Sequence, residues 1–261
     1  MRQCFSIGLF ALLVLSLPGC GGFRDTKPQL PGNLDTLCMP DYASGFEMYR
    51  YDSSTLLRIV NPWQGADSVS QWVFLSRDDE KPPKGFAGET IDVPVRRIVC
   101  MSSSYVAFLE ALGADSTICA ISGTGYIWSD KVRNRIAGGE IAEAGFDNSL
   151  NFEKLVALKP DVVFLYGLTG KNAVTDKLHE LGLKTVYIGD YVENNPLGRA
   201  EWITVFGEFT GRRELARTLF DSISNEYNRA KALVSGVEKR PEVMLNAPWQ
   251  DSWFVPGDRS Y

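Results

Sequence analysis

Apolar and polar positions follow three different patterns along the chain. Residues 42–75 alternate in places between apolar and polar side chains, with a turn-like DSS at 52–54, which predicts a small antiparallel sheet. From about residue 95 to 192, short apolar runs alternate with stretches of helical spacing. Residues 197–238 contain no strand-like run and are expected to be helical.

The strand–helix alternation can be divided into individual elements. Short apolar runs typical of buried parallel strands predict four strands, and helical spacing that ends at Gly or Pro predicts three helices. The expected strands lie in 96–103, 116–122, 161–166 and 184–189, and the expected helices in 104–113, 152–158 and 172–182. Because the two kinds of element alternate, we expect an α/β fold with a mainly parallel sheet.

A long helix is predicted after this alternation. Apolar residues recur on one helical face at Leu215, Leu219, Ile223, Tyr227, Ala230 and Val234. A helix over 212–235 would have about 24 residues and a length of ~36 Å, which suits a rigid strut. After Pro241, the run EVMLNA looks like the first strand of another unit, and the remaining residues are too few to form a domain.

The first residues have the features of an export signal. A positively charged start is followed by an apolar run over 5–17 and by the sequence LPGC, which ends at Cys20. This run is too short to span a membrane as a helix. Cys20 after a small residue resembles a lipoprotein processing site, where the Cys becomes lipid-modified. The alternative is an ordinary signal peptide with an incidental Cys.

Composition argues against several classes of function. The chain has 261 residues and a net charge of −5, without a basic stripe, which argues against nucleic-acid binding. A single histidine, His179, and the lack of a ligand cluster argue against a transition-metal site built from protein ligands. Cys100 and Cys119 lie in apolar strand-like runs, as two buried free thiols or as a disulfide, and both interpretations stay open.

Two loops that follow strands have positions typical of ligand-binding motifs. GLTGKN (167–172) sits where a phosphate-binding loop would, but its glycine spacing is too short and Asn172 replaces the Ser or Thr that binds magnesium. Ser103 and Ser104 end a strand and open a helix, where they cap the helix, meet an anionic ligand group, or do both. A nucleophilic serine would need a base, and His179 lies on a charged helix, so we expect no enzyme.

Aromatic residues occur in the loops that leave the strands. They are Tyr126, Trp128, Tyr166, Trp249 and Trp253. Ligands of open α/β sheets bind at the carboxyl ends of strands. Aromatic side chains at those ends suit a large, flat or partly apolar ligand. The alternative for each of these residues is a packing role.

The order of several sequence blocks resembles a known family. RRIVCMSSSYVAFLEALG, NFEKLVALKPDVVFLYG, LHELGLKTVYIG and VMLNAPWQDSWFVPG are similar to the substrate-binding proteins of ABC importers for iron–siderophores, haem and vitamin B12. The NFEKLVALKPDVV block is especially similar to cobalamin-binding members. The resemblance runs from about 93 to 261 and implies two α/β lobes that are joined by one long helix, with the ligand between them.

Together, the patterns and the resemblance divide the chain into six segments. They are a lipoprotein signal peptide (1–19), a tether (20–40), a small β-rich preface (41–92), an N-terminal α/β lobe (93–195), a helical connector (196–238) and the start of a truncated C-terminal lobe (241–261).

The resemblance also implies roles for single residues. The expected ligand cleft is formed by Ser103, Ser104, Tyr126, Trp128, Tyr166, Trp249 and Trp253. Glu153 matches an acid that pairs with arginines of the membrane-embedded permease in this family, and charge-assisted bonds of this kind would set the docking register. The alternative is that Glu153 only stabilises the start of its helix by its charge.

We therefore expect a monomeric lipoprotein of the periplasm, lipid-anchored to a bacterial membrane through Cys20. It would capture an iron chelate (siderophore or haem) or cobalamin and deliver this ligand to the permease of an ABC importer. It would have no cofactor of its own, although the ligand can carry iron or cobalt. The alternatives are a cobalamin-specific binding protein, an exported α/β hydrolase and a surface scaffold.

Overall fold

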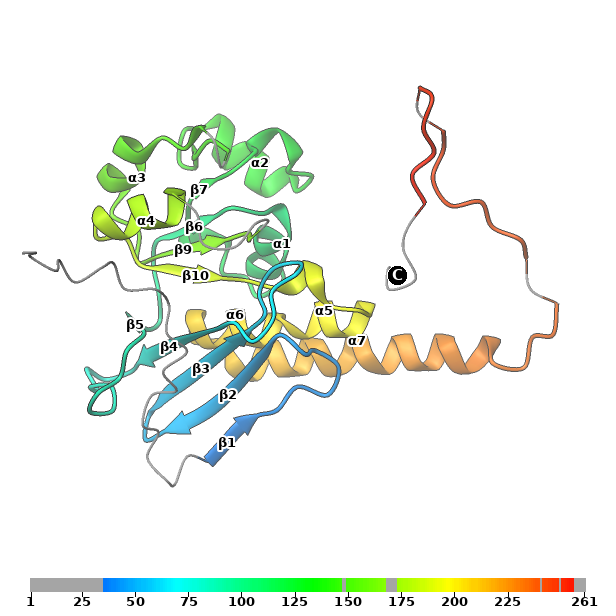
Figure 1. The fold of residues 1–261 in the computed structure, drawn as a ribbon, viewed down its shortest axis with the longest axis horizontal. Helices are drawn as coiled ribbons and strands as arrows, with labels where there is room; N and C mark the ends of the chain where they lie inside the picture. The colour runs from blue at the N-terminus through cyan, green and yellow to red at the C-terminus, as the bar shows by residue number, and fades with distance from the viewer. Residues whose placement is uncertain (1–34, 147–148, 168–172, 240, 249, 256–261) are drawn as a thin grey trace, which may run out of the picture.

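Two five-stranded sheets form the body of the molecule. The computed structural model describes residues 35–146, 149–167, 173–239, 241–248 and 250–255. The first sheet has the order β1 (Asp35–Cys38), β2 (Phe46–Tyr51), β3 (Ser54–Val60), β4 (Ser70–Ser76) and β5 (Glu89–Asp92). The second has the order β10 (Thr185–Tyr187), β9 (Val162–Leu165), β6 (Ile98–Cys100), β7 (Ile118–Ile121) and β8 (Ala142–Glu143). Figure 1 shows the second sheet above the first.

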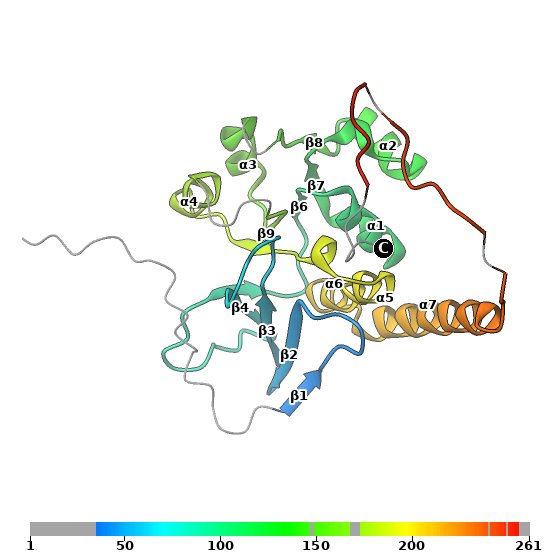
Figure 2. The same cartoon turned by 45° about the vertical axis from the view of Figure 1, so that its right-hand side comes forward.

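Helices cover both faces of the second sheet, whose strands are all parallel. The helices between its strands are α1 (Ser103–Ala111), α2 (Asp130–Ala137), α3 (Phe152–Leu158) and α4 (Ala173–Glu180). Figure 2 shows α3 and α4 on one side of this sheet and α1 and α2 on the other. A parallel sheet that is covered on both faces is what strand–helix alternation produces, and the predicted α/β fold is confirmed.

The first sheet is mostly antiparallel. Strands β1 to β4 pair antiparallel, and β5 adds parallel to β4. Tyr51 pairs with Ser54 across a two-residue turn in which Asp52 has a φ of 45°, so the predicted hairpin is present. Strand β1 lies inside the stretch 20–40 that was expected to be a tether. Its four residues are too few to show an alternating pattern in the sequence.

One apolar core joins the two sheets. Leu57 and Val73 of the first sheet belong to the same buried cluster as Phe164 of the second. The rings of Phe206 and Phe209 lie 5.0 and 4.9 Å from the ring of Phe164, centroid to centroid. These two residues come from α6 (Ile203–Thr210), in which all eight residues are buried. The preface and α6 therefore pack with the α/β lobe, although the sequence assigned them to separate segments.

Gln71 of β4 connects the two sheets where their edges meet. Its side-chain amide donates to the Thr185 carbonyl oxygen at 2.8 Å and accepts from the Tyr187 N–H at 2.9 Å. These are the two groups that a neighbouring parallel strand would bond on either side of Val186. The buried amide thus takes the place of a strand at this part of the β10 edge, and it satisfies backbone groups that would otherwise be costly to bury.

Two carboxylates fasten the segment 41–45 to the lobe. Glu201 accepts from the three backbone N–H groups of 41–43 at 2.8 to 2.9 Å. Glu193 accepts from the N–H groups of Ser44 and Gly45, and from the Trp202 indole at 2.9 Å. Glu201 belongs to α5 (Pro196–Glu201), so these bonds tie the start of the first sheet to the helices that follow the second.

The three described cysteines are all free. Cys100 faces the core cluster between the two sheets, whereas Cys119 faces the cluster under α3 and α4. Neighbouring strands place these side chains on opposite faces of the sheet, which keeps the sulfur atoms apart. Of the two interpretations left open by the sequence, the structure supports two buried thiols.

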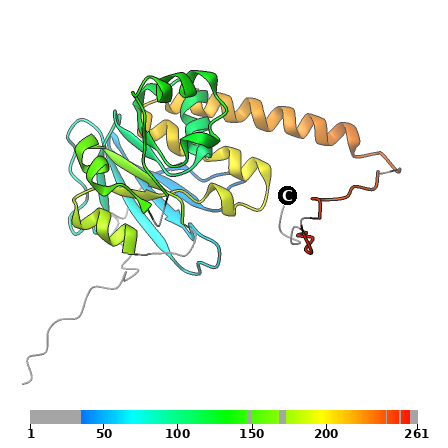
Figure 3. The same cartoon turned by 90° about the horizontal axis from the view of Figure 1, so that it is seen from above.

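The predicted long helix is present as α7 (Arg213–Val234), with 22 residues. Its buried residues are Ala216 and Phe220 in the first turns, whereas the later turns are exposed. Figure 3 shows the helix extending away from the two sheets. The predicted strand EVMLNA was wrong for this structure, because residues 241–248 form no strand. A strand needs a partner for its backbone groups, and the described residues offer this segment none.

Candidate functional site

The order of the parallel strands reverses between β6 and β9. The chain proceeds from β6 to β7 and β8 on one side and then to β9 and β10 on the other. Ligands of open α/β sheets bind in the crevice outside the carboxyl ends of the strands at such a point. Ser103 and Ser104 follow β6, and Tyr166 follows β9, so these predicted residues lie at the reversal. We call the carboxyl ends of β6 to β10, with their loops, the carboxyl edge.

The serines cap helix α1. The Ser102 hydroxyl accepts from the Ser104 N–H at 3.3 Å, and the two hydroxyl oxygens are 3.0 Å apart. Ser103 is exposed and Ser104 is half-buried. Ser104 also stabilises the charged form of the Asp190 carboxyl group. The chain thus brings an anionic group of its own to the start of α1, and Ser103 is left as the more accessible of the two predicted residues.

Asp190 is a buried acid at the carboxyl edge that the sequence analysis missed. It follows β10 and is only 1% exposed. Burial raises the pKa of its carboxyl group, although Ser104 and Arg199 act in the opposite direction. Arg199 Nε lies 3.4 Å from one carboxylate oxygen. The only signal in the sequence was an acid placed directly after the strand KTVYIG.

Glu143 connects the loops that follow β7 and β8, at the other end of the carboxyl edge. Its carboxylate accepts from the N–H groups of Gly123 (2.9 Å), Thr124 (2.8 Å) and Gly145 (3.0 Å), and from the Thr124 hydroxyl (2.6 Å). Burial raises the pKa of Glu143, but these hydrogen bonds outweigh burial and lower the pKa below its usual value. Gly123 and Gly145 both have positive φ, at 76° and 87°, so the two loops depend on glycine to reach this carboxylate.

Exposed aromatic side chains extend from the loops that Glu143 joins. Tyr126, Trp128 and Phe146 expose 69%, 88% and 54% of their surface. The rings of Tyr126 and Phe146 meet edge to face, with their centroids 6.5 Å apart. Large apolar side chains that stay in solvent are unusual unless they contact something. Phe146 was missed because β8 has only two residues and gave no strand pattern to place it.

Tyr166 lies against Tyr191, which follows β10. Their ring centroids are 4.5 Å apart, and Tyr166 is half-buried. The Tyr191 hydroxyl donates to the Gly167 carbonyl oxygen and accepts from the Gln64 N–H at 3.1 Å. Burial raises the pKa of Tyr191. Tyr166 therefore has a packing role in addition to any contact with a ligand.

The remaining predicted residues lie elsewhere. Trp253 is half-exposed and donates its indole N–H to the Leu245 carbonyl oxygen at 3.0 Å, a contact within the C-terminal stretch. Trp249 and Cys20 lie outside the described residues. Glu153 is exposed in the first turn of α3, after the N-cap Asn151. Both predicted roles of Glu153, docking and stabilisation of the helix start, require an exposed acid at this place.

The described residues offer neither a metal site nor a membrane-spanning helix. They contain no group of three or more His, Cys, Asp or Glu side chains that could hold a metal ion. None of their helices is long and apolar enough to cross a membrane. His179 of α4 bonds the Thr185 hydroxyl of β10 at 2.7 Å and lies 3.4 Å from Glu89 of β5, so these contacts are not with the serines of α1.

The sequence was compared with known proteins. Residues 98–261 match the model of the periplasmic binding protein family. The chain belongs to this family. It is also similar to an uncharacterized lipoprotein of Methanocaldococcus jannaschii, with 27% identity over 294 residues that cover 100% of this chain and 70% of the relative. A second uncharacterized lipoprotein of that organism is 28% identical over 240 residues, which cover 89% of this chain and 58% of the relative.

A solved structure matches part of the fold of this periplasmic binding protein. The periplasmic haem-binding protein HutB of Vibrio cholerae superposes with a TM-score of 0.43 and 22% identity, over 56% of this chain and 51% of that chain. The chain thus spans about half the length of this structure.

Family membership confirms the predicted fold and the prediction that the chain is not an enzyme, because members bind a ligand and do not transform it. It also indicates that the protein acts outside the cytoplasm. The matched region starts at residue 98, so the first sheet (35–92) precedes it.

Proposed function

We propose that this periplasmic binding protein captures an iron chelate (siderophore or haem) or cobalamin and delivers it to the permease of an ABC importer. The observation that carries the proposal is the exposed aromatic group Tyr126, Trp128 and Phe146 at the carboxyl edge of a binding-protein fold. Haem and cobalamin have broad, flat ring systems, and many siderophores carry flat aromatic or extended apolar parts. Aromatic side chains bind such surfaces by stacking and apolar contact.

The rest of the carboxyl edge supplies polar groups near this aromatic group. Ser103 is exposed at the first turn of α1, where its hydroxyl and the free N–H groups of the helix start suit a carboxylate, hydroxamate or phosphate of the ligand. Tyr166 lies on the β9 side of the strand reversal. In this proposal the ligand extends from the β7 and β8 loops toward the reversal point.

A cobalamin-specific protein is the second candidate. It is favoured by the block NFEKLVALKPDVV, which resembles cobalamin-binding members and contains Glu153. The two candidates predict different ligand profiles. A cobalamin-specific protein retains cyanocobalamin alone, whereas a chelate-binding protein retains ferrichrome or haemin.

Equilibrium dialysis of the chain against cyanocobalamin, ferrichrome and haemin tests the proposal. We expect one of them to be retained, and the double variant Y126A/W128A to bind it about tenfold more weakly. The matched control is Tyr227→Ala, which removes a ring that is 41% exposed on α7, away from the carboxyl edge. Retention of none of the three ligands, or equal weakening by Y227A, would contradict the proposal.

The proposed delivery step assigns docking to Glu153. Its carboxylate is exposed on α3, so it is available to an Arg of a permease without removal from an internal partner. Glu153→Lys should abolish the stimulation of permease ATPase in proteoliposomes and leave ligand affinity unchanged. Glu238→Lys makes the same charge change at an exposed site beyond α7 and serves as the control. Loss of ligand affinity in E153K would overturn the docking role.

The proposed location is the periplasm, with a lipid anchor at Cys20. Two similar proteins carry the name lipoprotein, which supports this part of the proposal. We expect the protein from wild-type cells to partition into detergent and to carry acyl chains on Cys20 by mass spectrometry. Recovery of Cys20→Ser in the same detergent phase would contradict the anchor.

A further inference from the structure

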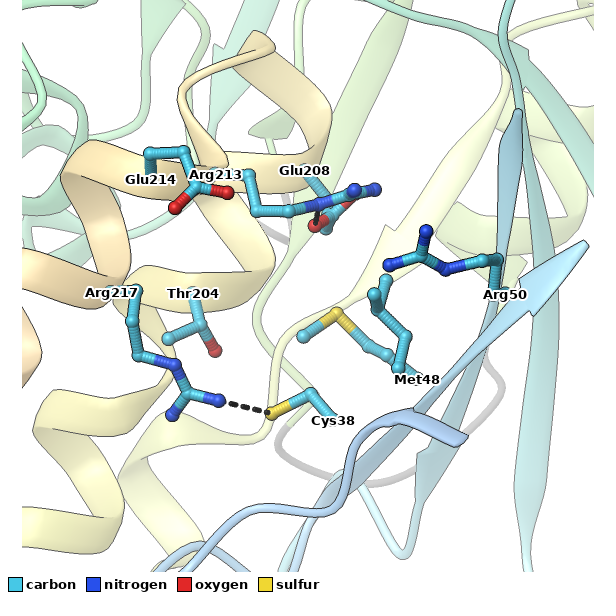
Figure 4. Close-up of a pocket in the computed structure, with 9 residues that line it drawn as sticks. Cys38, Met48, Arg50, Thr204, Glu208, Arg213, Glu214 and Arg217 are labelled. Atoms are coloured by element: carbon cyan, nitrogen blue, oxygen red, sulfur yellow. Dashed lines mark hydrogen bonds and ion pairs between the residues drawn. The ribbon is translucent and has the colours of Figure 1, made fainter. Parts of the chain in front are cut away.

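A cavity lies between the first sheet and the start of α7, and no residue of the carboxyl edge lines it. It has a volume of about 210 Å³. Its polar walls are formed by Arg50 of β2, by Glu208 of α6, and by Arg213 and Arg217 of α7, as Figure 4 shows. Since β1 and β2 precede the region that matches the family model, one wall of this cavity lies outside the matched region.

One of the three arginines is already paired. Arg213 forms a two-pronged ion pair with Glu208, in which Nη2 lies 2.7 Å from Oε2 and Nε donates to Oε1. Thr55 of β3 donates its hydroxyl to the same carboxylate at 2.9 Å. Glu208 is 2% exposed, so its charge is buried and is neutralised by Arg213. This network forms a rigid wall of the cavity and adds no net charge to it.

The other two arginines have no carboxylate partner in the part of the chain that the structure describes. The Arg217 guanidinium donates to the thiol of Cys38 at 3.9 Å, and a thiol is a weak acceptor. The side chain of Arg50, which lies in β2, forms no ion pair or hydrogen bond with the residues that the structure describes. The remaining acid of the lining, Glu214, is exposed, as are Arg50 and Arg217. Three Arg and two Glu give the lining a net charge of +1, in a chain whose net charge is −5.

The start of α7 lies in the wall of the cavity, with the acid Glu214 in its first turn. The helix begins at Arg213, in the wall of the cavity, and no side chain caps its first turn. The free N–H groups and the aligned peptide dipoles of a helix start favour an anion. Glu214 offsets part of this contribution, so the two arginine side chains supply the main attraction for an anion.

We propose that this cavity binds the phosphate group of a small organic phosphate. Figure 4 shows Arg217 and Arg50 on opposite sides of the cavity. A phosphate presents oxygens in a tetrahedral arrangement and can accept from guanidinium groups on two sides, whereas a carboxylate presents both of its oxygens in one plane. Leu37 and Met48 supply an apolar patch of the lining for the carbon part of the molecule.

The size of the cavity fits a small molecule. A volume of about 210 Å³ corresponds to roughly seven water molecules at their liquid volume. The phosphate can belong to a soluble ester or to the headgroup of an anionic phospholipid. The second source deserves a separate test because β1, which carries Leu37 and Cys38, begins 15 residues after the predicted lipidation site Cys20 (35 − 20 = 15).

Titration calorimetry of the full chain with glycerol 3-phosphate tests the soluble source. We expect saturable binding, with at least about tenfold weaker affinity in Arg217→Gln and in Arg50→Gln. The loss should be smaller in Arg217→Lys, which keeps the positive charge but not the paired donors of a guanidinium group. The matched control is Arg229→Gln, on the same helix, where Arg229 pairs with Glu226 on an exposed surface. Equal weakening by R229Q would show a general charge effect and would overturn the proposal.

Sedimentation with vesicles tests the lipid source. Vesicles of phosphatidylglycerol in phosphatidylcholine should retain the wild type and lose R217Q, while pure phosphatidylcholine retains neither. Binding of glycerol 3-phosphate without vesicle binding assigns a soluble ester, and R217Q-sensitive vesicle binding alone assigns a headgroup. Binding of neither probe up to millimolar concentration would overturn the proposal. Circular dichroism of R217Q and R50Q checks that both variants are folded.

Discussion

Glu143 and Asp190 occupy the two ends of the carboxyl edge, yet their environments act on them in opposite directions. Glu143 accepts four hydrogen bonds from Gly123, Thr124 and Gly145, which lower the pKa of its carboxyl group although burial opposes them. Asp190 is more deeply buried, and burial raises the pKa of its carboxyl group despite help from Ser104 and Arg199.

The difference shows what determines the behaviour of a carboxylate in this fold. At the β8 end, three backbone N–H groups donate to Glu143, so its charge holds the loops after β7 and β8 together. These loops carry the exposed aromatic side chains. At the β10 end, the donors are fewer and burial dominates. The charge of Glu143 therefore stabilises the fold, whereas the charge of Asp190 costs free energy. This contrast yields four predictions.

The largest expected effect on stability is that of Glu143→Ala. It leaves the N–H groups of two loops without their shared acceptor and should lower the free energy of unfolding by about 2 kcal/mol at neutral pH. Urea unfolding measures this loss. The control Glu140→Ala removes an acid that is 62% exposed and pairs with Arg135 at the surface, and it should change stability little.

The loss should also depend on pH. Because the pKa of Glu143 is lowered on folding, its stabilising contribution is present above the unfolded pKa and is lost as the pH falls through the folded pKa. The difference between wild type and Glu143→Gln should therefore shrink on acidification. An unchanged difference at low pH would show that the charge of Glu143 does not hold the loops.

Asp190→Asn should have a smaller effect of the opposite sign. Removal of an incompletely compensated buried charge should raise the free energy of unfolding by about 1 kcal/mol at neutral pH. A raised folded pKa means that stability falls as the pH rises from the unfolded pKa through the folded pKa. The advantage of D190N should thus disappear in acid. A destabilised D190N at neutral pH would mean that the pair with Arg199 outweighs burial.

The exposed aromatic side chains should matter for binding and hardly for stability. Trp128 is 88% exposed, so Trp128→Ala should change the free energy of unfolding by less than about 0.5 kcal/mol. Ligand affinity should fall in the same variant. A clear loss of stability in urea would assign Trp128 a packing role and would remove it from the proposed site.

Glu153→Lys should also have only a small effect on the isolated protein. The side chain is exposed at the start of α3, so the change removes a favourable charge from the helix start and adds an unfavourable one, which together are worth about 0.5 kcal/mol. Thermal unfolding should show a small decrease at low salt that salt reduces. A large decrease would show that Glu153 is a structural residue.

Much of the α/β lobe could be predicted from the sequence, and the reasons are local. The strands of the parallel sheet are short apolar runs, and α7 shows its apolar stripe over many turns, so both give a strong pattern. Strand β1 and strand β8 were not predicted because four and two residues show no period. EVMLNA was predicted as a strand from its composition, but a strand also requires a partner.

The site was less predictable because it depends on contacts between distant segments. Tyr126 and Trp128 could be chosen because they follow a recognisable strand. Glu143 and Asp190 could not, since their roles come from donors and burial that the sequence does not display. The cavity beside α7 was hidden for the same reason: its arginines come from β2 and from a helix about 160 residues later.

The most direct test of the central claim, that the ligand contacts the aromatic group at the β7 and β8 end, is tryptophan fluorescence during a titration. Wild type and Trp128→Phe are titrated with the ligand retained in dialysis, and free tryptophan corrects for absorption by the ligand. The account predicts saturable quenching in the wild type and loss of most of its amplitude in W128F. Quenching of equal amplitude in W128F would contradict it.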